Sequence, residues 1–428
     1  MRKFRQGDKH PDIAFVQLGL ARAGHAPEKQ DGTLDEQTQT ALTAFRRERG
    51  LKSDPGIAES DWRALAPFLV GYIRYKAKEG ETPEKLAKRF RTTVQAIETA
   101  NPSVVTEGIQ VAAQMVIPLG FPVVPTNIPF TSKVCRYVIQ GLTKRYPDIK
   151  QDCFGKSALG QDLTVLVFGS GKREISYNAT HHGNEWITTP ILLKFLEEYA
   201  GARAKDETIG GMSAKHLYEA SVLHLIPMLN PDGADIATGA IDQGAEFEYA
   251  TYLAENAPNI PFPAGWKANA RGVDLNLQYP AGWERAKEIK FAQGVRFPGP
   301  RDYVGGHVLS EPESKALYDY TQSRDFKLTM SYHSQGKVIY WQYLDHLPKG
   351  AREIGETLSA LSGYELEETP YESGHAGYKD WFIKNYDRPG YTIEVGLGEN
   401  PLPLSQFDEI YHDNEGMLAV GLVIEGAH

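Results

Sequence analysis

From about residue 131 onwards, the chain alternates between two apolar patterns. Continuous apolar runs predict buried strands, and apolar residues three and four apart predict helices. Strands are expected at 163–168, 175–179, 222–229, 328–332 and 391–395, and a helix at 186–199. Such alternation is typical of an α/β fold, here a three-layer α/β/α domain with a mixed central sheet. In such sheets the reactive residues lie on loops at strand ends.

The chain before this domain divides into smaller segments. Residues 1–70 have helical periodicity and predict a small all-α domain. Residues 71–120 begin and end with strand-like alternation around two short helices, which predicts a β-α-α-β module. Closely spaced prolines indicate a semi-rigid linker over 121–130, so the α/β domain is expected to occupy 131–428.

Two local patterns predict further detail. Thr33 and Glu36 have the spacing of a capping box, which predicts that Thr33 caps the second helix. The segment 237–265 contains several aromatic residues and prolines, and we interpret it as an irregular insertion in the wall of a cleft. Its aromatic side chains are expected either to pack internally or to form a platform for substrate.

Composition limits the classes of function. The chain has 428 residues, enough for two or three domains, and 41% of them are hydrophobic, which provides a substantial core. Its net charge of -9 argues against nucleic acid as the main partner. No apolar run approaches the roughly 20 residues of a membrane-spanning helix, so no membrane span is expected.

The first residues are partly basic but lack the apolar centre of a secretory signal. Asp8, Lys9 and Asp12 interrupt every apolar stretch in this region. We therefore expect either synthesis in the cytoplasm without a Sec signal or export by another route.

One short motif provides ligands for a metal ion. His182 and Glu185 stand three residues apart after a predicted strand, so a turn can direct an imidazole and a carboxylate at one cation. Zinc accepts both donor types, and a catalytic zinc site adds a third protein ligand, an open position and a nearby base. His333, Asp274 and Glu394 lie in three distant motifs that can supply these groups. Either histidine alone would more often be a structural residue at a strand end.

On these motifs, residues 130–428 resemble the zinc carboxypeptidase (carboxypeptidase A-like) family. The matching sequences are His182-Gly-Asn-Glu185, Ser-Tyr-His333-Ser, Tyr-Thr-Ile-Glu394-Val-Gly and an Asn-Pro-Asp-Gly segment after a central strand. The resemblance implies one zinc ion held by His182, Glu185 and His333, with Glu394 as the general base. It also implies that Asp274 orients the ring of His182, although a simple loop cap is the alternative for Asp274.

The resemblance implies roles for two further residues. Arg271 stands where the family keeps an arginine that stabilises the oxyanion, and losing one such donor usually lowers the rate by about 10²–10³. A surface ion pair is the alternative for Arg271. Tyr371 resembles the mobile phenol that closes on substrate in this family.

One departure from the family pattern concerns the terminal carboxylate of the substrate. Exopeptidases of this family have Asn-Arg where this chain has Asn276-Leu277, and the arginine grips that carboxylate with a bidentate fork. Leucine has no such donors, so we expect another anchor or an internal cleavage site, with Asn276 binding a substrate carboxylate or amide. Weaker candidates for the anchor, each otherwise a plain loop residue, are His307, His375 and Lys379.

The two N-terminal segments also resemble known families. Residues 1–68 resemble a peptidoglycan-binding helical domain, and residues 71–120 resemble a LysM module, which binds glycans that contain N-acetylglucosamine. The combination resembles γ-D-glutamyl-meso-diaminopimelate peptidases. It implies hydrolysis of that bond in peptidoglycan stem peptides, with glycan strands as partners in the cell wall or spore cortex.

Three other functions remain open on these residues. The chain can be an ordinary metallocarboxypeptidase with wall-binding modules attached. It can also be a deacylase of N-acyl amino acids on the same fold, or a wall-binding scaffold with an inactive peptidase domain. The last requires a missing ligand or base, and none is missing here.

Overall fold

The computed structural model describes residues 3–426, and the contacts between Cα atoms divide the chain into two compact units. The first unit extends to Pro129 and also includes residues 133–149. The second combines residues 130–132 with the chain from Lys150 onwards. Most of helix α7 (Ser132–Arg145) therefore belongs to the first unit. The finer division into 1–70, 71–120, 121–130 and 131–428 stays a prediction.

The first unit begins with the expected all-α domain, made of three helices: α1 (Pro11–Arg22), α2 (Glu36–Arg49) and α3 (Glu59–Val70). Helix α2 is capped by Asp35, whose carboxylate accepts a hydrogen bond from the Thr38 backbone N–H at 2.7 Å. Thr33 instead forms a β-bridge with Lys9, because the chain is still extended at this point. The prediction that Thr33 caps the helix is therefore wrong.

The second part of this unit is a small module around a two-stranded sheet. Strand β1 (Tyr72–Lys76) pairs antiparallel with β2 (Gln114–Pro118). Between them lie three short helices: α4 (Pro83–Phe90), α5 (Val94–Ala100) and α6 (Pro102–Glu107). We expected two short helices here, but Pro102 begins a third, because proline fits the first turn of a helix, where it needs no N–H partner. The module thus has one helix more than predicted.

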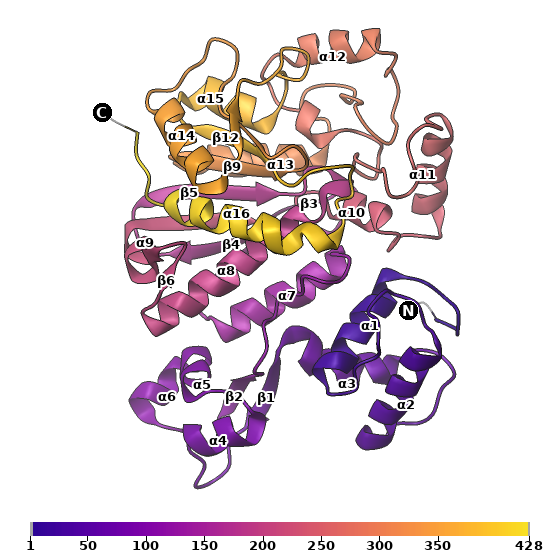
Figure 1. Ribbon diagram of the computed structural model, residues 1–428, viewed down its shortest axis with the longest axis vertical. Coiled ribbons are helices and arrows are strands. Elements are labelled where there is room, and N and C mark those ends of the chain that lie inside the picture. Colours follow the sequence, from indigo (N-terminus) through magenta and orange to yellow (C-terminus); the bar gives the residue numbers. More distant parts are fainter. Residues whose placement is uncertain (1–2, 427–428) are drawn as a thin grey trace. The chain divides into compact units, whose positions relative to one another are not determined.

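A mixed sheet of eight strands forms the centre of the second unit (Figure 1). Its order is β11-β10-β12-β9-β5-β8-β4-β3. The strands are β3 (Lys150–Lys156), β4 (Asp162–Gly169), β5 (Arg173–Ala179), β8 (Ser221–Ile226), β9 (Leu328–His333), β10 (Val338–Tyr340), β11 (Glu365–Glu367) and β12 (Gly390–Glu394). Strands β8, β5, β9 and β12 are parallel, whereas β3–β4, β4–β8 and β10–β12 pair antiparallel. The predicted mixed sheet is confirmed.

Helices cover both faces of this sheet, as the three-layer prediction requires (Figure 1). One face carries α8 (Thr188–Lys205), α14 (Ala351–Ser362) and α16 (Phe407–Val420), and the other carries α13 (Pro312–Gln322) and α15 (Tyr378–Tyr386). Tyr177 of β5 donates a hydrogen bond to the Leu418 carbonyl of α16 at 2.9 Å. On the opposite face, Trp381 and Phe382 of α15 pack against Ile226 of β8. Among the described residues, no helix is long and apolar enough to cross a membrane.

The remaining elements of the second unit lie in the connections. They are the strand pair β6 (Thr208–Ile209) and β7 (Met212–Ser213), the helices α9 (Ala214–Ala220), α10 (Pro231–Ala237), α11 (Ala245–Glu255) and α12 (Trp283–Ala292), and the 3-10 turns η1 (Gly183–Glu185), η2 (Leu275–Leu277) and η3 (Leu404–Gln406).

Helix α11 lies within segment 237–265, which we expected to be irregular. Its buried side is built largely from alanine, and this weakens the apolar period in the sequence. Phe262 packs on Phe247 and on Trp266, with ring centroids 5.6 and 6.0 Å apart. These aromatic rings therefore pack internally, whereas Tyr252 is exposed.

A close approach of two backbone segments positions the turn after β5. A Cβ atom on Gly183 would lie 2.4 Å from the backbone of Gly233 in α10, so only glycine fits at position 183. The Asn230 amide donates hydrogen bonds to the carbonyls of His181 and Ala268, at 3.0 and 3.1 Å. The Asn-Pro-Asp-Gly segment thus holds the η1 turn against the sheet.

Candidate active site

The predicted metal ligands meet at the carboxyl ends of parallel strands. His333 is the last residue of β9 and lies opposite Glu394, the last residue of β12. His182 follows the neighbouring strand β5, and Glu185 lies in the η1 turn directly after it. Because parallel strands end at the same edge of a sheet, these side chains converge from distant parts of the sequence.

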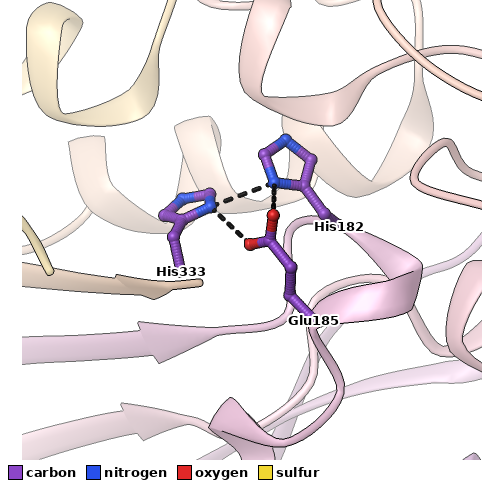
Figure 2. A group of neighbouring side chains, drawn as sticks. All are labelled: His182, Glu185 and His333. Atoms are coloured by element: carbon purple, nitrogen blue, oxygen red, sulfur yellow. Dashed lines mark hydrogen bonds and ion pairs between the residues drawn. The ribbon is translucent and has the colours of Figure 1, made fainter. Parts of the chain in front are cut away.

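The side chains of three candidate ligands point toward one another (Figure 2). His182 Nδ1 lies 2.9 Å from Glu185 Oε1, and His333 Nδ1 lies 3.0 Å from Glu185 Oε2 and 3.1 Å from His182 Nδ1. Ligands bound to a tetrahedral zinc ion at 2.0–2.1 Å lie about 3.3 Å apart, so the spacing fits zinc closely. Among residues 3–426, His182, Glu185 and His333 form the one cluster of histidine, cysteine or acidic side chains whose ligand atoms are close enough to hold a metal ion.

Burial and mutual attraction set the protonation of this cluster. Burial disfavours a charged ring at His182, but the carboxylates of Glu185 and Asp274 outweigh it and raise the pKa of His182 to about 9. Burial opposes ionisation of Glu185 too, yet His182 and Lys267 hold the pKa of Glu185 well below its usual value. Burial lowers the pKa of His333. Glu185 is therefore a carboxylate, the form in which it binds metal.

Asp274 fixes which nitrogen of His182 faces the cluster. Its carboxylate lies 3.0 Å from His182 Nε2, and a carboxylate can only accept, so Nε2 carries the proton and donates it. When the ring loses its second proton on binding a metal ion, the other nitrogen, Nδ1, therefore offers its lone pair on the side of Glu185 and His333. Asp274 also accepts from the Asn276 backbone N–H at 3.1 Å and begins η2. We considered two alternatives for Asp274, a partner that orients His182 and a simple loop cap. Its carboxylate makes the contacts of both.

A polar cleft of about 470 Å³ opens beside the cluster. It is lined by Asn184, Asn259, Ile260, Pro261, Gly265, Lys267, Arg301, Ser334, Gln335, Tyr340, Glu394, Gly398, Glu399 and Asn400. Burial, and then the charge of Glu185, raise the pKa of Glu394 to about 8. A divalent cation next to Glu185 would oppose this rise by favouring the carboxylate.

Lys267 is the cation that pairs with the candidate metal ligand Glu185, and the sequence patterns did not indicate it. Its Nζ lies 3.6 Å from Glu185 Oε1, and Glu185 and Asp274 raise its pKa although burial acts in the opposite direction. The guanidinium of Arg271 lies instead 3.7 Å from Glu311, its side chain is 55% exposed, and it does not line the cleft. Arg271 thus forms an ion pair near the surface, which is the alternative that we considered for it.

The predicted substrate-binding residues lie outside this cleft. Leu277 is buried in an apolar cluster with Trp283 and Val304. Asn276 Oδ1 accepts a hydrogen bond from the Tyr378 backbone N–H at 3.1 Å. Tyr371 is 52% exposed. Its role as a mobile phenol stays a prediction.

The weaker candidates for an anchor differ in environment. Lys379 is buried, forms an ion pair with Asp380 at 2.6 Å, and donates to the Gln342 carbonyl, so its charge is already neutralised. His307 is exposed and lies beside its neighbour's carbonyl. His375 is buried, and neither ring nitrogen has a hydrogen-bond partner among the described residues.

Two histidines, an acidic ligand and a facing carboxylate at a sheet edge define a mononuclear metallohydrolase site. The zinc carboxypeptidase family model matches residues 136–416, a peptidoglycan-binding domain model matches 9–64, and a LysM domain model matches 75–118. The chain therefore belongs to the zinc carboxypeptidase family, and it is a zinc metallopeptidase with two peptidoglycan-binding modules.

Individual relatives agree with this assignment. The chain is 41% identical over 286 residues to γ-D-glutamyl-L-diamino acid endopeptidase 1 of Lysinibacillus sphaericus, covering 67% of this chain and 70% of that protein. It is 25% identical over 294 residues to human carboxypeptidase Z, covering 65% of this chain and 38% of that protein.

Solved structures show the same fold. Carboxypeptidase A from Helicoverpa armigera has a TM-score of 0.51 at 16% identity, covering 91% of this chain and 85% of that chain. Bovine thrombin-activatable fibrinolysis inhibitor has a TM-score of 0.50 at 20% identity, covering 69% and 95%. The predicted carboxypeptidase-type fold is thus confirmed. The family model and the cluster of two histidines and a glutamate confirm the zinc cofactor.

Proposed function

We propose that this peptidase hydrolyses the γ-D-glutamyl-meso-diaminopimelate bond of peptidoglycan stem peptides. The observation that carries the proposal is the 41% identity to a γ-D-glutamyl-L-diamino acid endopeptidase over 67% of this chain. The matches to a peptidoglycan-binding domain and a LysM domain support it, because such domains bind the polymer that carries these stem peptides.

The surroundings of Leu277 support a substrate other than an ordinary protein C-terminus. Its side chain is 9% exposed and packs against Trp283 and Val304, so this position offers no donor to a terminal carboxylate. A classical exopeptidase needs a charged fork there. We therefore propose that the leaving amine of the substrate is not held by an arginine bound to a terminal carboxylate.

His182, Glu185 and His333 would hold the zinc ion, which supplies Lewis-acid activation of water and of the scissile carbonyl. Glu394 faces the same cleft from the end of β12 and acts as the general base. It accepts one proton from the attacking water. It then delivers this proton to the nitrogen of the leaving diaminopimelate as the C–N bond breaks, so the carboxylate is regenerated.

We assign the oxyanion contact to Lys267. Its ammonium lies at the metal cluster, inside the cleft and mostly out of solvent. A fixed positive charge in such a site stabilises the negative charge that develops on the carbonyl oxygen of the tetrahedral transition state. Asp274 contributes indirectly, because it holds the ring of His182 in the orientation that the ligand set needs.

The N-terminal modules indicate that the enzyme acts on cell-wall material. We propose that they bind the glycan strands of the wall or of the spore cortex, while the cleft takes the stem peptides. Binding to the polymer would raise the local concentration of substrate at the catalytic domain.

The test is a digest of L-Ala-γ-D-Glu-meso-diaminopimelate by the zinc-loaded chain, analysed by mass spectrometry. We expect L-Ala-D-Glu and free diaminopimelate as products, and loss of this activity in Glu394→Gln. Glu356→Gln is the matched control, because Glu356 lies on the exposed side of α14 in an ion pair with Arg352. If Glu394→Gln cleaved the peptide at the wild-type rate, the assignment of the base would be wrong.

A further inference from the structure

The cleft contains a second cation that the proposed mechanism does not use. Arg301 lines the cleft together with Lys267, Asn184 and Asn400. Both cationic side chains therefore face the same cleft. A pair of neighbouring cations in one cleft repels, so its presence points to a ligand that carries negative charge.

The hydrogen bonds of Arg301 leave its terminal nitrogens available. Its Nε donates to Asp302 Oδ2 at 2.9 Å, and the structure gives no partner to Nη1 or Nη2 among the described residues. Asp302 is also ion-paired with Lys290, at 2.7 Å. Asp302 thus divides its charge between Arg301 and Lys290, and the two terminal nitrogens of Arg301 stay available for a ligand in the cleft.

We propose that Arg301 binds the α-carboxylate of the D-glutamyl residue and so makes the enzyme selective for an acyl group that carries this carboxylate. The inference rests on the proposed function and names what that site recognises. In a γ-linked substrate, the free carboxylate lies four bonds from the scissile carbonyl carbon, roughly 5 Å in an extended chain. A guanidinium that lines the same cleft as Lys267 can bind that carboxylate with two parallel hydrogen bonds from its terminal nitrogens.

The residues that share the cleft with Arg301 indicate that it binds the acyl part of the substrate, the part that carries the scissile carbonyl. Lys267 and Glu394, which act on the scissile carbonyl, stand in this cleft with Arg301. The residues that we predicted for the amine side, Asn276 and Leu277, do not line it. We therefore assign this cleft to the part of the substrate that carries the scissile carbonyl.

The test compares two substrates on three forms of the full zinc-loaded chain. One substrate is L-Ala-γ-D-Glu-meso-diaminopimelate, and the other carries D-isoglutamine, in which the α-carboxylate is an amide. The wild type should prefer the carboxylate by about 10- to 100-fold in kcat/KM, the range of a charge-assisted hydrogen bond. Arg301→Gln should lose this preference. Arg296→Gln is the control, because Arg296 is exposed and outside the cleft.

Binding to the metal-free chain gives a second, independent result. Calorimetry with L-Ala-D-Glu and L-Ala-D-isoglutamine should show tighter binding of the carboxylate in the wild type and equal binding in Arg301→Gln. If Arg301→Gln keeps the preference in both assays, the inference is overturned. Failure of the wild type to cleave either peptide would refute the proposed function, while the calorimetry would still decide the role of Arg301.

Discussion

The contact between Asp274 and His182 yields the most specific prediction about the metal. Asp274 is 3% exposed, and its carboxylate accepts the Nε2 proton of His182 at 3.0 Å. Nearby positive groups outweigh the effect of burial and hold the pKa of this carboxyl below its usual value, so Asp274 is charged at neutral pH. Removing such a partner of a metal-binding histidine lowers metal affinity by about 10- to 100-fold, or about 1.4–2.7 kcal/mol. Asp274→Ala should weaken zinc binding by this factor.

The assay is a competition titration of zinc between the protein and a coloured chelator at pH 7.5. Asp274→Asn keeps an acceptor for His182 and loses the charge, so its dissociation constant should lie between those of wild type and Asp274→Ala. Asp319→Ala is the control, because Asp319 is exposed on α13 and pairs only with Lys315 in a surface ion pair. A folded Asp274→Ala chain that binds zinc as tightly as wild type would refute the reasoning.

Three further predictions concern the cleft, the core and the pH dependence of stability. Lys267→Met should lower kcat by about 10²–10³ in the peptide digest, whereas Arg271→Met should have little effect, since only Lys267 lies at the metal cluster. Leu277→Ala should lower the free energy of unfolding by about 2–5 kcal/mol in urea titrations, because its side chain fills an apolar cluster. Burial raises the pKa of Glu313 from its usual 4.5 to about 7, so the folded state keeps a proton that the unfolded state releases. Stability should therefore fall by about 3 kcal/mol as pH rises from 4.5 to 7, and calorimetric unfolding of Glu313→Gln should lack this part of the slope.

The cluster of candidate metal ligands could be predicted because its signals are local. His182 and Glu185 share one turn, and the strands before His333 and Glu394 have clear apolar patterns. Parallel strands end at one edge, so the four side chains meet wherever such a sheet forms. The sheet and its helices follow from the same periodicity, and for this reason the three-layer fold was predicted correctly.

The identity of the cation at the site could not be predicted in this way. Lys267 and Arg271 are four residues apart in a segment without regular structure. The backbone there is held by distant partners: Gly183 N–H donates to the Lys267 carbonyl at 2.9 Å, and Lys267 N–H donates to the Pro300 carbonyl at 2.8 Å. These contacts decide which side chain faces the cleft, and no pattern in the neighbouring sequence records them.

Smaller errors have equally local causes. Helix α11 was missed because alanine supplies much of its buried side. Asp35, one residue before α2, caps that helix in place of Thr33. At Leu277 the sequence showed that an arginine is missing, but the burial of the leucine depends on its packing against Trp283 and Val304, which only the fold brings together.

The measurement that tests the account most directly is a paired digest with the zinc-loaded chain. One substrate is L-Ala-γ-D-Glu-meso-diaminopimelate, and the other is a standard peptide with a C-terminal L-residue. Mass spectrometry should detect cleavage of the γ-linkage alone, because Leu277 provides no grip for a terminal carboxylate. Cleavage of the standard peptide alone would contradict the account and would identify an ordinary carboxypeptidase with wall-binding modules attached.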